Sequence, residues 1–144
     1  MINKIKVSAL TILFLVAFSS CKKSDNSASN QVNTLNTTVQ QGKWRVSFFS
    51  SSSNDETSHY TGYEFQFITG GTITATKTGS SVSGTWSNGS DDSTIKLVLN
   101  FGVSAPFLEL NNDWHVTQQS STIITLEDVS GGSGGTDYLT FAKI

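Results

Sequence analysis

From residue 42 to the C-terminus, apolar and polar residues alternate with a period of two. Trp44 and Val46, for example, stand on either side of Arg45. Successive side chains of a strand point to opposite faces, so this alternation is typical of strands with one buried face. The pattern predicts half-buried β-strands rich in Thr, Val, Ile and aromatic residues in eight segments: 44–48, 63–67, 73–75, 82–86, 95–101, 114–116, 124–126 and 139–141.

Glycine-containing turns separate most of these predicted strands. Gly70-Gly71 joins two apolar runs so closely that a hairpin is expected there. We also expect turns at 79–80, 88–89 and 131–135, where glycine follows or precedes a small polar residue.

Helical signals are weak along the whole chain. We expect only a short helical turn within 35–41, because no amphipathic stretch of ten residues is evident. Segment 106–110 fits either a brief helix or a bent strand.

Short connections between eight predicted strands favour an all-β fold. Eight antiparallel strands can close into an up-and-down barrel, which leaves no exposed strand edge. A barrel of this size holds packed side chains or one small ligand. A β-sandwich is the alternative, but it needs longer crossing connections, and only 50–62 and 102–112 are candidates.

The first twenty residues have the pattern of a secretion signal. Lys4 and Lys6 precede an apolar run over 7–18, and small residues follow at Ser19 and Ser20. The apolar run is shorter than the ~20 residues that cross a bilayer. We therefore exclude residues 1–20 from the predicted fold.

Cys21 is the only cysteine, and it directly follows the predicted signal. The segment Phe18-Ser19-Ser20-Cys21 resembles the lipobox of bacterial lipoproteins, although Phe18 stands where an aliphatic residue is usual. The resemblance implies acylation of Cys21, a membrane as partner through this lipid anchor, and a place in the cell envelope, at the outer membrane. An ordinary cleaved signal with a free thiol at Cys21 is the alternative.

Residues 21–40 are predicted to be the lipidated cysteine and a flexible tether. Residues 22–31 are polar and contain no aromatic side chain, so they cannot bury enough apolar surface to fold alone. Residues 41–144 then form the folded domain, about a hundred residues long, which is the usual size of a single small domain.

Residues 40–144 resemble the lipocalin-like domains common in lipoproteins of the Bacteroidetes type. The resemblance implies a barrel that binds a small apolar molecule or no ligand, and it implies no catalysis. By the same resemblance, Trp44 plugs the base of the barrel. It depends on the order of short motifs: Gly42-Lys43-Trp44, Gly71-Thr72-Ile73, Gly84-Thr85-Trp86, the apolar strand 95–99, the segment 110–116 and Ile124-Thr125-Leu126.

Charge argues against nucleic acid as a partner. The chain has nine basic and eleven acidic residues, and the loss of Lys4 and Lys6 with the signal leaves seven basic residues and a net charge of −4. Basic residues are also not clustered, whereas nucleic-acid-binding domains carry a basic patch or stripe.

Groups that could perform catalysis are sparse, so we expect no enzyme activity, cofactor or metal. His59 lies in a polar loop with Asp55 and Glu56, which could form a site but fits solvated loop charges better. His115 should face away from the core, since it alternates with apolar neighbours. Residues 91–92 could bind calcium, but the order of ligands does not match an EF-hand loop.

One modification motif stands in the same region. Asp92-Ser93-Thr94 matches the short O-glycosylation motif known in Bacteroidetes. A chance match of three residues is the alternative.

Two functions are compatible with the predicted barrel. The first is a membrane-tethered module that binds a small hydrophobic ligand, and the alternative is a structural or protein-interaction module with a solid core, its partner unknown. An enclosed apolar cavity of about 300 Å³ or more would favour the first function.

We expect Phe49, Ile68 and Val98, which are out of phase with the alternation, to lie on the surface as a contact patch. Nine aromatic residues are predicted to line a cavity or fill the core: Trp44, Phe48, Tyr63, Phe65, Phe67, Trp86, Phe101, Trp114 and Phe141.

Overall fold

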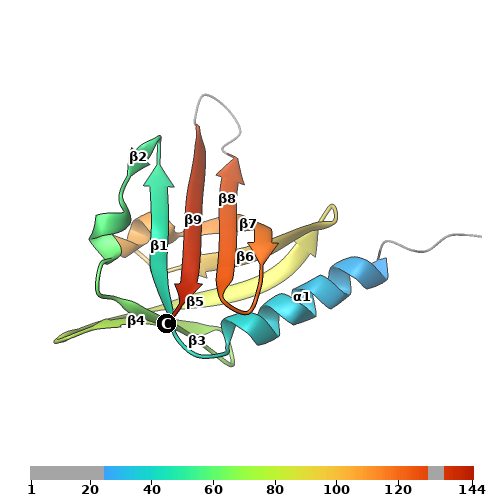
Figure 1. The fold of residues 1–144 in the computed structure, drawn as a ribbon, viewed down its shortest axis with the longest axis horizontal. Coiled ribbons are helices and arrows are strands. Elements are labelled where there is room, and N and C mark those ends of the chain that lie inside the picture. The colour runs from blue at the N-terminus through green and yellow to red at the C-terminus, as the bar shows by residue number, and fades with distance from the viewer. Residues whose placement is uncertain (1–24, 130–134) are drawn as a thin grey trace, which may run out of the picture.

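The structure, a computed structural model, describes residues 25–129 and 135–144. Eight antiparallel strands close into a barrel, as the alternation predicts (Figure 1). Neighbouring strands in the barrel follow one another along the chain, and β1 pairs with β9 to close it. The described elements are α1 (Asp25–Val39), β1 (Trp44–Ser51), β2 (Asn54–Asp55), η1 (Thr57–Tyr60), β3 (Glu64–Ile68), β4 (Thr72–Lys77), β5 (Ser80–Asp91), β6 (Thr94–Asn100), η2 (Phe107–Leu110), β7 (Asn112–Gln119), β8 (Ile123–Val129) and β9 (Thr136–Lys143), where η marks a 3₁₀ helix.

The two long connections contain short 3₁₀ helices and do not cross between sheets. The first holds β2 and η1, and the second holds η2, so segment 106–110 forms the brief helix. The first connection also completes the barrel wall, because β1 pairs with β3 only at Trp44 and Phe65. Beyond that pair, Phe49 bonds to the loop instead: its carbonyl accepts from the Glu56 N–H at 2.9 Å, and its N–H donates to the Thr57 hydroxyl at 2.8 Å.

One predicted turn is wrong. Asn88 and Gly89 lie inside β5, where they pair with Leu97 and Lys96 of β6. The chain turns instead at Asp92 and Ser93, whose φ angles are 45° and 66°. Two successive positive φ angles match the twist of a tight hairpin, and Asp tolerates this conformation better than most residues.

The prediction for the two adjacent phenylalanines of β1 is also wrong. Phe49 is fully buried, and Phe48 is 41% exposed. The reason is a β-bulge: Val46 pairs with Phe141 and Phe48 with Thr140, so Ser47 is an extra residue in β1. An extra residue reverses the inward and outward phase of all residues after it.

The flexible tether predicted for 21–40 is wrong over 25–39, where α1 forms. Leu35 and Val39 are fully buried in the barrel core, and Ala28 and Val32 pack against it. These four residues follow one another at spacings of four, three and four, so they form one stripe on the helix. Figure 1 shows α1 lying across one end of the barrel.

The junction of α1 and β1 is secured by Trp44. Its indole N–H donates to the Val39 carbonyl at 2.8 Å, which satisfies one of the free carbonyls at the end of a helix. Gly42 between them has a φ of 83°, a conformation that favours glycine. Trp44 is fully buried at the end that α1 covers, which we call the base.

Gly84 marks the tightest approach between a strand and its neighbour. A Cβ atom there would contact the Asn100 carbonyl oxygen and would lie 2.9 Å from Phe101 Cδ1. We expect Gly84→Ala to lower the free energy of unfolding by about 1–3 kcal/mol, because β5 and β6 would have to separate. Urea denaturation measures it. Gly89→Ala in the same strand is the control, since nothing lies within 4 Å of that position; equal losses would contradict the explanation.

Candidate functional site

The barrel interior is the first candidate, because the predicted aromatic set lies there. Seven of the nine residues are buried: Trp44, Phe65, Phe67, Trp86, Phe101, Trp114 and Phe141. Phe48 lies outside the barrel, and Tyr63 is half-buried, packed edge-on to Phe107 at 5.0 Å between ring centroids.

Three buried aromatic residues were missed by the alternation. Phe49 is shifted inward by the bulge, whereas Tyr60 and Phe107 belong to η1 and η2. The helix expected as one option for 106–110 was a partial signal for Phe107. Tyr60 stands in a polar loop that carries no periodic signal, so the sequence pattern could not place it.

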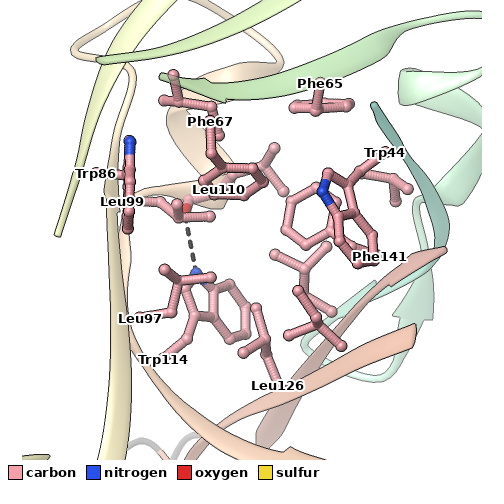
Figure 2. Packing of buried hydrophobic residues seen from close by; sticks show 14 of the residues in the cluster. Trp44, Phe65, Phe67, Trp86, Leu97, Leu99, Leu110, Trp114, Leu126 and Phe141 are labelled. Carbon is pink, nitrogen blue, oxygen red and sulfur yellow. Dashed lines mark hydrogen bonds between the residues drawn. The ribbon is translucent and has the colours of Figure 1, made fainter. Parts of the chain in front are cut away.

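Aromatic rings pack against one another through the interior (Figure 2). Phe65 meets Phe141 at 5.4 Å, Phe67 meets Trp86 at 5.5 Å, and both pairs are edge-to-face. Edge-to-face contact at these distances is a favourable ring geometry. The Trp114 indole N–H donates to the Leu110 carbonyl at 2.9 Å, a bond drawn in Figure 2. The aromatic set therefore fills the core.

The end opposite the base, which we call the mouth, is covered by η1 and η2. Tyr60 packs edge-on to Phe49 at 5.5 Å and to Phe107 at 5.8 Å, and its hydroxyl donates to the Pro106 carbonyl at 3.0 Å. Burial raises the pKa of Tyr60 far above its ordinary value, and the carboxylates of Glu109 and Glu56 raise it further. Tyr60 thus stays a neutral hydrogen-bond donor that joins the two loops.

Hollows on the surface of the described residues do not enter this core. One hollow, of about 460 Å³, lies on the polar face of α1 between Asn30 and Thr38. A second, about 280 Å³, lies at the base, where Trp86 is its aromatic side chain among Asn, Gln, Thr, Ser and Gly residues. Neither is the enclosed apolar cavity that a hydrophobic ligand requires.

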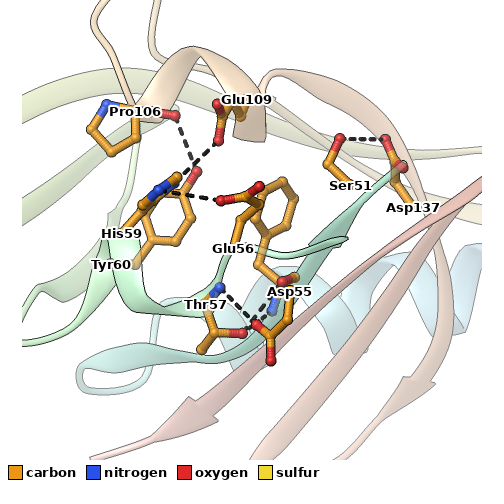
Figure 3. Close-up of polar contacts among 10 residues, drawn as sticks. Ser51, Asp55, Glu56, Thr57, His59, Tyr60, Pro106, Glu109 and Asp137 are labelled. Carbon is orange, nitrogen blue, oxygen red and sulfur yellow. Dashed lines mark hydrogen bonds and ion pairs between the residues drawn. The ribbon is translucent and has the colours of Figure 1, made fainter. Parts of the chain in front are cut away.

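The polar loop at the mouth brings His59 between two glutamates (Figure 3). His59 Nε2 lies 3.2 Å from Glu56 Oε2, and His59 Nδ1 lies 3.6 Å from Glu109 Oε2. Glu109 comes from η2, fifty residues away along the chain, so the loop sequence could not indicate it. The predicted third member, Asp55, bonds to Thr57 instead. Among residues 25–129 and 135–144, no three His, Cys, Asp or Glu side chains are arranged to hold a metal ion.

Asp55 contributes to a pH dependence of stability. Hydrogen bonds from the Thr57 hydroxyl and the Thr57 N–H lower the pKa of Asp55. A lowered folded-state pKa adds stability above the ordinary pKa of aspartate, and this stability is lost as the pH falls through the folded value. The free energy of unfolding, measured by urea denaturation at pH 7 and at about pH 3, should therefore change less between the two pH values in Asp55→Asn than in the wild type. An unchanged difference would contradict this role for Asp55.

The predicted calcium position at residues 91–92 is occupied by an ion-pair network. Lys96 Nζ lies 2.9 Å from Asp113 Oδ2 and 3.4 Å from Asp91 Oδ2. The hydrogen bond to Asp113 raises the pKa of Lys96, and both carboxylates attract the ammonium. Asp91 therefore already has a cation beside it. Ser93 lies exposed in the turn, and its glycosylation stays a prediction.

The remaining predicted sites lie on the outer surface or outside the described residues. His115 pairs in register with Lys96 and Glu127, away from the core as expected. Ile68 and Val98 are exposed as expected, and Phe49 is not. Cys21 and the signal at 1–20 fall outside the described residues. Among the described residues, no helix is long and apolar enough to span a bilayer.

Comparison with known proteins supports the fold alone. No protein-family model matches the sequence, and no curated protein matches it. The structure is similar to the crystal structure of a DUF4847 family protein from Bacteroides vulgatus, with a TM-score of 0.52 and 19% sequence identity. The similarity covers 76% of this chain and 97% of that one. At this identity the similarity shows the fold alone, since one fold can serve many functions.

Proposed function

We propose that this protein is a lipid-anchored, non-catalytic module of the bacterial cell envelope, which acts through its outer surface. The barrel serves as a rigid support with a solid core. It presents a surface to a membrane or protein partner and holds no small molecule inside.

The filled and covered interior is the observation that carries this proposal. Leu35 and Val39 of α1 close the base, and Tyr60 and Phe107 cover the mouth. Between them, aromatic rings contact one another at 5.0–6.5 Å between centroids. A hydrophobic ligand would have to displace several of these buried side chains, each of which contributes on the order of 1.5–3 kcal/mol to folding.

The N-terminal sequence supports the anchor. A charged start, an apolar run and small residues precede Cys21, in the order of a lipoprotein signal. The closed barrel also fits the lipocalin-like domains of Bacteroidetes lipoproteins that the motifs resemble.

Binding of a small apolar ligand is the competing function. It would require η1 and η2 to move away from the mouth and to take the buried Tyr60 and Phe107 side chains out of the core. The solid-core function requires no such rearrangement, and we prefer it for that reason.

Native mass spectrometry of the full chain, purified in mild detergent from its own host envelope, tests both parts. We expect a single species whose mass includes acyl chains on Cys21 and no other small molecule. The Cys21→Ser variant should lose the acyl mass. A small molecule released on denaturation would overturn the solid-core function, and an unmodified Cys21 would overturn the anchor.

A further inference from the structure

Three segments that meet at the base of the barrel contain no charged residue. Residues 26–42, 65–76 and 78–90 have no Asp, Glu, Lys, Arg or His among them. Apart from Ile68, their exposed residues are Asn, Gln, Ser, Thr and Gly. Soluble domains average about 25% charged residues, so this part of the surface is unusual in being polar and neutral.

The hollow of about 280 Å³ at the base lies where these segments meet. Asn36 and Gln40 of α1 form one wall, residues 69–71 of the turn between β3 and β4 form the second, and residues 86–88 of β5 form the third. The volume is near the lower limit of ~300 Å³ for small-molecule sites. The hollow therefore has room for one ring of a ligand, outside the filled core.

Hydrogen bonds tie the walls of this hollow to one another. The Thr69 hydroxyl donates to Gln40 Oε1 at 2.5 Å, and Gln40 Nε2 donates to Asn36 Oδ1 at 3.1 Å. Asn88 Nδ2 donates to the Val32 carbonyl at 2.7 Å, which joins β5 to α1. Because the side chains are already held in place, little conformational freedom is lost when a ligand binds.

Other polar groups of the same side chains remain available to a ligand. Within the described residues, Asn36 Nδ2, Asn88 Oδ1 and the Ser87 hydroxyl have no hydrogen-bond partner. The amide nitrogen donates, the amide oxygen accepts, and the hydroxyl does both. A ligand with several hydroxyl groups, each of which donates and accepts, matches this mixture.

Trp86 adds a small apolar surface to the hollow. Its indole N–H donates to the Ile68 carbonyl at 3.0 Å, and its ring packs edge-to-face on Phe67 at 5.5 Å, so the ring is fixed. Trp86 is only 6% exposed, too little to hold a hydrophobic ligand. Exposed ring carbon beside neutral polar groups suits a molecule that carries both C–H and hydroxyl groups.

We propose that this hollow binds a neutral saccharide, with one sugar ring between α1 and β5. None of the lining residues is charged, so no cation would offset the cost of desolvating a phosphate or a carboxylate. Saccharide binding goes beyond the proposed function and leaves the solid core unchanged. It does not depend on the acylation of Cys21.

Two-dimensional NMR of the isotope-labelled full chain tests the site. The detergent has a polyoxyethylene headgroup, which contains no sugar. The probes are the neutral disaccharides cellobiose, maltose and N,N′-diacetylchitobiose, with digalacturonic acid as the anionic counterpart. We expect at least one neutral disaccharide to shift the backbone amide signals of Gly70, Gly71 and Ser87, and digalacturonic acid to shift them several-fold less.

A matched pair of double variants tests the polar groups. Replacing Asn36 and Ser87 with Ala should lower the affinity for the bound disaccharide about tenfold, the usual effect of losing two neutral hydrogen bonds. Replacing Asn33 and Ser83 with Ala should leave the affinity unchanged. These two residues are exposed on the same helix and the same strand, and neither lines this hollow. The spectrum of each variant without sugar shows whether it is folded.

The outcomes separate this site from the anchor. The absence of shifts at ~20 mM of every neutral disaccharide would overturn the site, since this concentration nearly saturates a site with a Kd of ~1 mM. Shifts confined to other parts of the barrel, or equal losses in the two double variants, would also overturn it. Equal binding of digalacturonic acid would overturn the preference for a neutral ligand. An unmodified Cys21 would overturn the anchor and leave the saccharide site intact.

Discussion

Phe49→Ala should lower the free energy of unfolding by about 3–5 kcal/mol, whereas Phe48→Ala should change it by less than about 1 kcal/mol. The two residues are adjacent and chemically identical, so only their placement differs. Phe49 is fully buried and packs edge-on to Tyr60 at 5.5 Å and to Trp114 at 6.4 Å. Its removal leaves a cavity next to both rings.

Urea denaturation of the two variants, followed by tryptophan fluorescence, measures this difference. The same experiment tests the bulge at Ser47, because without it the inward phase would fall on Phe48. Equal losses, or a larger loss for Phe48→Ala, would show that the bulge does not form. A Phe49→Leu variant should lose less than Phe49→Ala, since it leaves a smaller cavity.

Leu35→Ala should lower the free energy of unfolding by about 2–5 kcal/mol, the usual cost of truncating a fully buried leucine. Leu35 lies in the same cluster as the barrel aromatics, although it stands outside the region of alternating residues. A large loss would show that α1 is part of the domain, whereas truncation of a residue in a flexible tether costs nothing. Thermal or urea unfolding of the full chain gives the value.

Thr34→Ala is the control for this prediction. Thr34 is the preceding residue on the same helix, but it is exposed and bonds only to the Asn30 carbonyl. We expect a change of less than about 0.5 kcal/mol, as for most surface positions. If Leu35→Ala were equally mild, α1 would not be packed on the barrel.

Most of the barrel could be predicted from the alternation. Alternate side chains of the strands at 82–86, 95–99 and 139–141 point inward as expected, because a side-chain period of two is a local property of extended backbone. The turn at Gly70-Gly71 was also predicted correctly, because two adjacent glycines are a local signal for a tight turn. By contrast, Asn88-Gly89 has the sequence of a turn, but pairing along the full length of β5 and β6 overrides it.

The helix was missed for a compositional reason. Residues 25–39 contain mostly Asn, Ser, Thr and Gln, which have low helix propensity, and only a narrow apolar stripe. That stripe, at 28, 32, 35 and 39, was a readable signal. Contact with the barrel base stabilises the helix, since helices this short are marginal without tertiary packing.

The candidate site was the least predictable part. His59 and Glu109 lie on different loops, and Tyr60 and Phe107 meet only because η1 and η2 cover the same end of the barrel. No sequence period relates them.

The sequence by itself determined the eight strands, their antiparallel order and most of the buried set, because these follow from local periodicity and short connections. Only the tertiary structure decided which phenylalanine of β1 enters the core, whether 25–39 folds, and whether the interior is hollow or filled. Those outcomes depend on contacts between residues far apart in the chain, where one extra residue in a strand or one ring from a loop changes what each neighbour can bury.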